Sequence, residues 1–252
     1  MSRGKGSTKN SMLLYGKNSV FERLKADPQS IKKVFLLDNF AAPHIEELIG
    51  KKNIPCARLG FRELNKIKPS KDLQGIVAQV DSFRYADFDS LLEDQPGKQA
   101  ALILLDRIND PQNLGAIIRT AACFGGFAVV IPKFEACEVT EAVLHVASGG
   151  ENFVPVSMVS NLANCLIKAK KKEYWVIGGI IGEEAQYLNK ISIPYPLALV
   201  LGSEGGGVRH GLEKHLDIKA RIPMSGADLS FNVAQACAVF CYEIVRQREK
   251  IY

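Results

Sequence analysis

The 252-residue chain has no hydrophobic run that approaches the ~18 residues of a membrane-spanning helix. Its first ten residues also lack the apolar stretch of a secretory signal. No two of its six cysteines form a C-x-x-C pair, which argues against a zinc ribbon or a redox motif. The four histidines show neither ligand nor triad spacing. These absences predict a cytoplasmic protein with no membrane span and no metal site, whose reduced cysteines act as small hydrophobic residues.

Positive charge is in only modest excess. The formal net charge is +5 and the sequence pI is about 8.8, which is below the level that by itself marks a nucleic-acid-binding protein. Lysines nevertheless cluster through the first third of the chain and again at residues 168–172. Such clusters are either solvated helix ends and loops or a dispersed surface that contacts phosphates, and the sequence leaves both interpretations open.

The sequence pattern divides the chain into four segments. Hydrophobic residues make up 47% and charged residues 23%, as in soluble globular proteins with a real core. Residues 1–11 are a polar, basic tail that we expect to be disordered. Residues 12–80 form a small α/β domain, residues 81–99 a polar connector and residues 100–252 a second domain.

Helices and strands are predicted to alternate in both domains. In the first domain we expect helices at residues 17–25, 43–49 and 61–67 and strands at residues 33–37 and 74–80. A short helix is expected at residues 88–92 of the connector. In the second domain we expect strands at residues 101–105, 127–131, 153–156, 174–177, 197–201 and 218–222, and helices at residues 111–124, 140–147, 162–171 and 232–248. Because several strands are continuous apolar runs, the predicted fold class is α/β, a parallel sheet covered on both faces.

Three stretches of the second domain differ from ordinary α/β sequence. The first is residues 109–115 (NDPQNLG), which follow a predicted strand end, where open α/β sheets place their ligands. Arg119 follows six residues after Asn113, about 120° around the predicted helix, so only a long side chain reaches back toward Asn113. Arg119 either contacts a ligand or is an amphipathic arginine whose head lies in solvent.

The second stretch is residues 199–209, in which a strand leads into four glycines around Glu204. Glycine permits positive φ and lets a ligand approach the backbone closely. The dinucleotide pattern G-x-G-x-x-G fails at His210, and the Gly-Lys-Ser/Thr of a P-loop is absent. This predicts a glycine-rich ligand loop of another kind, with a flexible turn as the alternative.

The third stretch is residues 222–236, in which a polar loop precedes the final helix. Val233, Cys237 and Phe240 follow a helical apolar spacing, which indicates a face packed in the core. Ser230 and Asn232 stand just before this helix, so each is either a pocket residue or simply the helix N-cap.

Together the stretches NLGAIIRTAACFG (residues 113–125), LVLGSEGGGVR (residues 199–209) and IPMSGADLSFNVAQA (residues 222–236) resemble, in order and spacing, the three signature motifs of the SpoU/TrmH family of RNA ribose 2′-O-methyltransferases. The first third of the chain, with YGKNSV (residues 15–20) and QGIVA (residues 74–78), resembles the family's N-terminal substrate-binding domain, which is similar to a ribosomal-protein RNA-binding fold. Possession of this domain makes the chain most similar to members that methylate a guanosine of large-subunit (23S) rRNA.

The resemblance implies a C-terminal α/β domain with a deep trefoil knot of the SPOUT type, a homodimer through that domain, and S-adenosylmethionine as cofactor. In this family the methyl donor sits in the knot and is held largely by backbone groups. The matching positions are Gly178, Gly179, Leu201, Gly202, Ile222, Phe231 and Asn232. The family usually has Leu at the position of Phe231, so we expect the backbone contact to be kept and the adenine pocket to be reshaped.

The catalytic positions of the family carry over to Asn113, Arg119, Glu204, Ser230 and Asn232. Methyl transfer is an in-line displacement, so alignment supplies much of the acceleration. The family proposal makes Arg119 the base, helped by an RNA phosphate. A guanidinium stays protonated in proteins, which favours a clamp on a phosphate and on the alkoxide, and both roles stay open. Asn113 and Glu204 would orient Arg119 and the ribose, while Ser230 and Asn232 would shape the two pockets.

Two other classes of function compete with the methyltransferase. A non-catalytic RNA-binding or ribosome-assembly factor on the same fold is disfavoured by the joint presence of the catalytic positions, and S-adenosylmethionine binding would discriminate it. A nucleotide-dependent oxidoreductase is disfavoured by the absent G-x-G-x-x-G. Within the methyltransferase class, a tRNA or another rRNA site is the alternative substrate.

Overall fold

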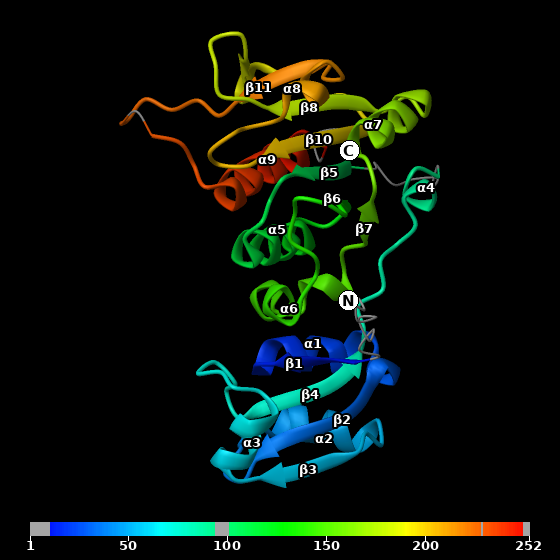
Figure 1. Ribbon diagram of the computed structural model, residues 1–252, viewed down its shortest axis with the longest axis vertical. Coiled ribbons are helices and arrows are strands. Elements are labelled where there is room, and N and C mark those ends of the chain that lie inside the picture. The colour runs from blue at the N-terminus through cyan, green and yellow to red at the C-terminus, as the bar shows by residue number, and fades with distance from the viewer. Residues whose placement is uncertain (1–10, 94–100, 228, 249–252) are drawn as a thin grey trace, which may run out of the picture. The chain divides into compact units, whose positions relative to one another are not determined.

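The structure is a computed structural model that describes residues 11–93, 101–227 and 229–248. The chain divides into two compact units, Met1–Arg84 and Tyr85–Tyr252 (Figure 1). Each unit has its own sheet and its own buried core.

The segment predicted as the connector, residues 81–99, is divided between the two units. Asp81 is the last residue of strand β4 in the first unit. Phe88–Leu91 forms the expected short helix, α4, whose N-cap Asp87 accepts a hydrogen bond from Ser90 N at 3.0 Å. Residues 94–100 of the connector and residues 1–10 of the expected tail lie outside the described residues. Ser11, which we assigned to the tail, is instead the first residue of strand β1.

The first unit is a four-stranded sheet in the order β1-β4-β2-β3 with three α-helices among its described residues. Its elements are β1 (Ser11–Tyr15), α1 (Lys17–Ala26), β2 (Ile31–Leu37), α2 (Pro43–Lys51), β3 (Cys56–Leu59), α3 (Phe61–Ile67) and β4 (Ile76–Asp81). Strand β4 pairs antiparallel with β1 and β2, and β2 pairs parallel with β3. The small α/β domain is confirmed, but the two edge strands, β1 and β3, were missed, and they are only five and four residues long.

The second unit has a seven-stranded sheet in the order β7-β6-β5-β10-β8-β11-β9, and every pair of neighbouring strands is parallel. The strands are β5 (Ala101–Asp106), β6 (Phe127–Pro132), β7 (Val156–Val159), β8 (Trp175–Gly179), β9 (Gln186–Tyr187), β10 (Leu197–Gly202) and β11 (Ile218–Arg221). The α-helices after α4 are α5 (Pro111–Phe124), α6 (Glu141–Ala147), α7 (Leu162–Lys171), α8 (His210–Glu213) and α9 (Val233–Arg248). The predicted parallel α/β sheet is confirmed.

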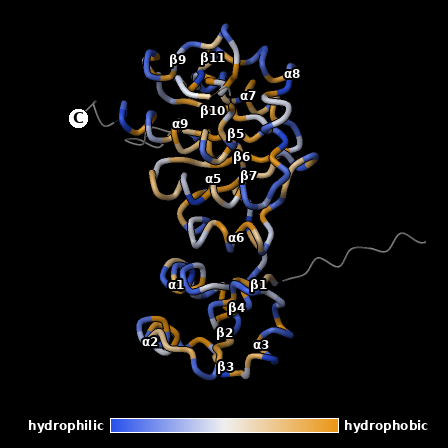
Figure 2. The backbone as a smooth tube through the Cα atoms, turned by 90° about the vertical axis from the view of Figure 1, so that its left-hand side faces the viewer, coloured by the Kyte–Doolittle hydropathy of each residue, from blue (hydrophilic) through white to orange (hydrophobic). Residues whose placement is uncertain are grey.

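Helices cover both faces of this sheet. On one face α4, α7 and α8 pack in a single apolar cluster with Leu104, Val130 and Val200 of the central strands. On the other face α5 packs against α6 and α9. Strands β5 and β6 are buried at every position, and Figure 2 shows the centre of this unit coloured mainly as hydrophobic. Burial on both faces explains why these strands are continuous apolar runs in the sequence.

The strand predicted at residues 153–156 is wrong. Gly150–Asn152 forms a short 3₁₀ helix, and β7 begins only at Val156. Ser148 and Gly149 are in the left-handed region, with φ of +57° and +95°, and Phe153 is 59% exposed. The chain therefore turns at residues 148–152 (SGGEN) and enters the sheet three residues later than the apolar residues of 153–156 predict.

The cysteines are free thiols with different surroundings. Cys165, Cys237 and Cys241 are buried, and burial raises the pKa of Cys165 to about 11. Cys56 and Cys123 are exposed, so the small hydrophobic role holds for only part of the set. Among the described residues no helix is long and apolar enough to cross a membrane, and no group of three or more His, Cys, Asp or Glu could hold a metal ion.

Gly115 marks the closest approach of α5 and α6. A β-carbon at this position would lie 2.6 Å from Cβ of Val146 and 2.8 Å from the carbonyl oxygen of Val143. Because the second atom belongs to the backbone, the contact cannot be relieved by a rotamer change. Glycine at position 115 therefore sets how α5, which carries Asn113 and Arg119, lies on the rest of the unit.

We predict that Gly115→Ala lowers the free energy of unfolding of the second unit by about 1–3 kcal/mol, because α5 and α6 must separate. Trp175 is the single tryptophan of the chain and belongs to this unit, so its fluorescence during urea unfolding measures the change. Gly211→Ala is the control, since a β-carbon at position 211 meets no atom within 4 Å. We expect it to stay within about 0.5 kcal/mol of the parent protein. Parental stability of Gly115→Ala would contradict the close contact.

Candidate active site

A cavity of about 530 Å³ opens at the carboxyl ends of β8, β10 and β11. Gly179 ends β8, Gly202 ends β10 and Arg221 ends β11, and all three line the cavity. This is the edge at which open parallel sheets bind their ligands. The remaining walls come from residues 180–187, residues 203–208 and the segment that leads into α9.

Most of the predicted cofactor positions line the cavity: Gly179, Leu201, Gly202, Ile222 and Phe231. Gly178 is not among the described residues that line it, because successive residues of a strand point to opposite faces. A β-carbon at position 178 would lie 2.3 Å from the side chain of Leu216, so this glycine serves packing on the other face. Asn232 stands next to the lining residues Phe231 and Val233.

One wall of the cavity is the glycine loop, which we define as residues 202–208. A β-carbon at Gly202 would lie 2.0 Å from the carbonyl carbon of Gly207, so only glycine fits where the loop folds back on itself. Gly207 N donates to Ser203 O at 2.8 Å, and Gly207 has a left-handed φ of +57°. The loop is therefore a tight turn that brings backbone atoms to the cavity wall.

Asn113, Glu204 and Asn232 form a hydrogen-bonded group, the amide–carboxylate cluster. Asn113 Nδ2 donates to Glu204 Oε1 at 3.1 Å, and Asn232 Nδ2 donates to the same oxygen at 2.5 Å. Asn232 Nδ2 also donates to Asn113 Oδ1 at 2.8 Å. The three residues come from α5, the glycine loop and the position before α9, so the fold brings together one residue from each of the three unusual stretches.

Asn232 has a second role at the start of α9. Its Oδ1 accepts a hydrogen bond from Ala234 N at 2.8 Å, as an N-cap does. The cap uses the side-chain oxygen and the cluster uses the side-chain nitrogen. Of the two interpretations that the sequence left open for Asn232, the N-cap is therefore confirmed, and its place in the pocket stays a prediction.

Arg119 and Ser230 are exposed, and neither takes part in the hydrogen bonds of the cluster. Arg119 lies on α5, and its side chain makes no hydrogen bond or ion pair with any residue that the structure describes. A β-carbon at Gly150 would lie only 3.0 Å from Cα of Arg119, so the backbone of α5 is closely packed at this point. The backbone of Arg119 is therefore fixed by packing, while its side chain is exposed to solvent. Ser230 lines the cavity.

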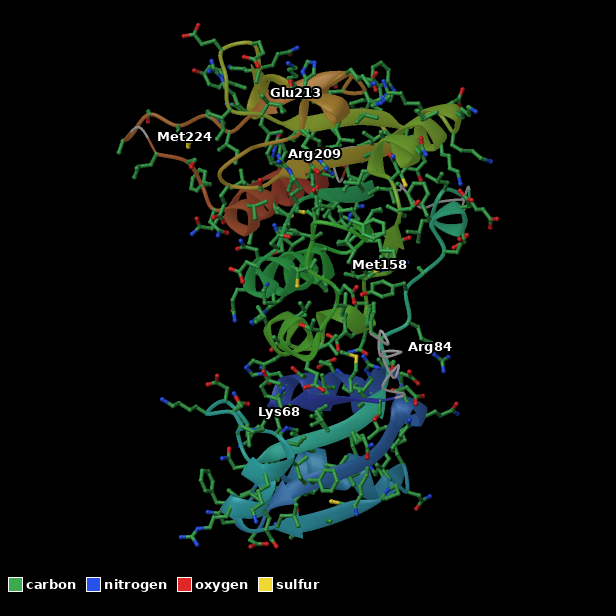
Figure 3. The ribbon with its side chains drawn as sticks, in the orientation of Figure 1. Lys68, Arg84, Met158, Arg209, Glu213 and Met224 are labelled. Carbon is green, nitrogen blue, oxygen red and sulfur yellow. The ribbon has the colours of Figure 1, made fainter. Side chains whose placement is uncertain are left out.

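Sequence reasoning missed Tyr187 and Arg221 at the cavity. The guanidinium carbon of Arg221 lies 4.4 Å from the ring centroid of Tyr187, and its Nη1 donates to Gly182 O at 3.2 Å. The pair fixes residues 182–187 against β11 along the lining. No motif signals this segment, since β9 is only two residues long. On the same rim, Met224 lies on the extended segment between β11 and α9 (Figure 3).

A ligand cavity at the carboxyl edge of a parallel sheet, with catalytic residue types beside it, defines an α/β enzyme that uses a small bound molecule. Residues 100–242 match the model of the SpoU rRNA Methylase family, and residues 13–86 match the model described as RNA 2′-O ribose methyltransferase substrate binding. The chain belongs to the SpoU rRNA methylase family.

Two curated relatives are similar to almost the whole chain. The 23S rRNA (guanosine-2′-O-)-methyltransferase RlmB of Coxiella burnetii is 35% identical over 241 residues, which cover 94% of this chain and 96% of the relative. RlmB of Nitrosomonas europaea is 34% identical over 245 residues, which cover 96% and 94%. The SpoU methyltransferase AviRb of Streptomyces viridochromogenes, solved with AdoMet, has a TM-score of 0.79 at 20% identity and covers 97% of this chain and 95% of its own. That likeness shows the common fold.

The SpoU family uses S-adenosylmethionine, and the cavity fits this cofactor. Its volume of about 530 Å³ lies within the ~300–1,000 Å³ of small-molecule sites. The lining combines apolar side chains, such as Leu201, Ile222 and Phe240, with the backbone of the glycine loop. At Gly205 a β-carbon would meet no atom within 4 Å, so the loop backbone is open to a ligand there.

We predict that Asn232→Ser separates the two roles of Asn232. Serine keeps an oxygen that caps α9, so the free energy of unfolding should change by less than about 0.5 kcal/mol. It loses the amide that donates to Glu204 and Asn113, so the single-turnover rate of methyl transfer should fall about tenfold or more. Trp175 fluorescence and transfer of labelled methyl groups measure the two quantities.

The matched variant Asn232→Ala loses the cap as well. We expect the same loss of rate with a further loss of about 0.5–2 kcal/mol of stability. A serine variant that keeps the parental rate would show that the amide–carboxylate cluster has no part in methyl transfer.

Proposed function

We propose that the protein transfers the methyl group of S-adenosylmethionine to the ribose 2′-hydroxyl of a guanosine in 23S rRNA. The observation that carries the proposal is the amide–carboxylate cluster at the cavity, built from three stretches that resemble the family's motifs. Two relatives named for this reaction cover nearly the whole chain. The match of residues 13–86 to a substrate-binding model supports RNA binding by the first unit, for which we propose the bounds 12–80.

The cavity residues bind the cofactor in this proposal. Gly179, Leu201, Gly202, Ile222 and Phe231 contact it directly, while Gly178 keeps Leu216 packed behind the strand and Asn232 holds the end of the lining segment. S-adenosylmethionine supplies a methyl group activated by its sulfonium. Backbone groups recognise it through the glycine loop, where no side chain blocks the approach.

The catalytic residues act mainly by orientation and charge. Asn113, Glu204 and Asn232 hold the ribose at the cavity mouth, and Ser230 shapes the substrate pocket. Arg119 has an exposed guanidinium, which binds an RNA phosphate and stabilises the negative charge that develops on the 2′-oxygen as it attacks the methyl group. Fixed donors aimed at developing charge need no rearrangement during the reaction.

The proposal includes a homodimer through the C-terminal domain, a trefoil knot and a cytoplasmic location. Tyr242 on α9 is 57% exposed, which supports a protein partner at this helix. Gln247 Oε1 accepts from Ile193 N and its Nε2 donates to Ile191 O, both at 2.9 Å, and this contact of α9 with the chain before β10 supports the knot. A ribosomal RNA substrate, as in the named relatives, supports the cytoplasmic location.

We predict transfer of labelled methyl groups from S-adenosylmethionine to one 2′-hydroxyl of protein-free 23S rRNA, with none to 16S rRNA or tRNA. Arg119→Ala should lower the rate about 10²- to 10³-fold, as expected for the loss of one preorganised donor. Mapping of the methylated ribose identifies the nucleotide.

Lys171→Ala is the matched control, because it removes one exposed cation from α7 and none from the cavity. It should keep the parental rate. Transfer to tRNA alone would replace the proposed substrate, and an Arg119→Ala rate equal to that of the control would remove Arg119 from the mechanism.

A further inference from the structure

Arg209, which Figure 3 labels, follows the glycine loop directly. A buried carboxylate, that of Asp106, holds it. Its Nε donates to Asp106 Oδ1 at 2.8 Å and its Nη2 lies 2.7 Å from the same oxygen. Its backbone N donates to the other oxygen, Oδ2, at 2.9 Å. Both oxygens of one carboxylate thus hold both the backbone and the side chain of Arg209.

Asp106 is completely buried at the carboxyl end of β5. It stands opposite Gly202 in the parallel pairing of β5 with β10, so it lies where the glycine loop begins. A buried carboxylate is tolerated only with hydrogen bonds and a counter-charge, and Arg209 supplies both. Asp106 therefore lies beside the first residue of the loop, Gly202, and binds Arg209, which follows its last residue.

Arg107 holds the loop from a second point. It has a left-handed φ of +60°, uncommon for a residue other than glycine, and its Nη2 donates to Gly207 O at 3.3 Å. Arg209 also reaches a third loop, because its Nη1 lies 3.0 Å from Glu135 Oε2 after β6. Loops after three neighbouring strands are thus connected through the two arginines.

We propose that Arg209, fixed by Asp106, is a positioning residue that sets the conformation of the glycine loop for both cofactor binding and the placement of Glu204. Glu204 reaches Asn113 and Asn232 from this loop, and the loop backbone forms a cavity wall. Arg209 acts through the loop and touches no reacting group. This inference rests on the proposed methyltransferase function.

The test compares full-length Arg209→Ala, Asp106→Asn and a matched control, Lys170→Ala. Lys170 Nζ pairs at 2.6 Å with Asp217, whose other oxygen accepts from Val176 N at 2.8 Å. The control therefore removes the same kind of cation–carboxylate contact, and the same charge as Arg209→Ala, at the amino end of β8. Measured are S-adenosylmethionine affinity by calorimetry, 23S rRNA affinity by filter binding, and the single-turnover rate at saturation.

We expect Arg209→Ala to weaken cofactor affinity and to lower the saturated rate, each about tenfold or more, with RNA affinity equal to that of the control. Asp106→Asn should have the same effects as Arg209→Ala. Because Asp106 is completely buried and cannot contact RNA, these effects cannot come from a lost RNA contact. The double variant should be little worse than Asp106→Asn, since the side-chain contact of Arg209 with Asp106 is already weakened in that variant. Arg209→Lys keeps the charge but not the planar fork, so its rate should lie between those of the parent and the alanine variant.

A loss of RNA affinity alone in Arg209→Ala would overturn the proposal and make Arg209 a phosphate contact. Full rescue by lysine would overturn it too, because charge would then suffice. If Asp106→Asn does not fold, the alanine and lysine variants still decide, since the Arg209 side chain is 40% exposed. Hydrogen exchange of the loop amides gives a readout that needs no activity: it should be faster in Arg209→Ala. Failure of the parent protein to methylate any RNA would refute the proposed function instead.

Discussion

The parallel pairing of β5 with β10 is the constraint on which the site depends. The two strands pair residue for residue from Leu197 opposite Ala101 to Gly202 opposite Asp106. Both are buried almost throughout, so a register shift would place apolar side chains wrongly against both helical layers. Because the strands end at the same level, the chain segments that follow them emerge side by side. Asn113 and Glu204 meet for this reason, although 91 residues separate them.

Much of the second unit could be predicted because its strands are buried on both faces. Continuous apolar runs located β5, β6 and β10, and a strand end followed by unusual polar residues located Asn113 and Glu204. The sequence could not show that Gly179 lines the cavity while Gly178 faces Leu216. Only the position of the strand in the sheet decides which of two neighbouring residues faces the cavity. Tyr187 and Arg221 could not be predicted for another reason. Their contact depends on how β9, a strand of only two residues, pairs with β11.

Several lysines of the clusters have partners within their own unit. Lys168 pairs with Asp89 and Lys170 with Asp217, each at 2.6 Å, so part of the cluster on α7 serves contacts within the second unit. In the first unit Lys68 lies 5.0 Å from the ring centroid of Tyr15. Exposed ion pairs of this kind contribute only about 0–1 kcal/mol to stability. For Lys168 and Lys170, the contacts within the unit favour the interpretation as solvated surface residues over a dedicated phosphate-binding surface.

The glycine loop combines two opposing requirements. Glycine lets the backbone approach a ligand and fold back on itself: a β-carbon at Gly202 would lie 2.0 Å from the carbonyl carbon of Gly207. Glycine also loses the most conformational freedom when the chain becomes ordered. With four glycines in residues 202–208, the loop has few side chains of its own to hold it. The ordering must come from neighbours, and Asp106, Arg107 and Arg209 lie at the ends of the loop, where they can restrain it without entering the cavity. A completely buried carboxylate at the end of β5, unusual in an otherwise apolar sheet, is explained by this need.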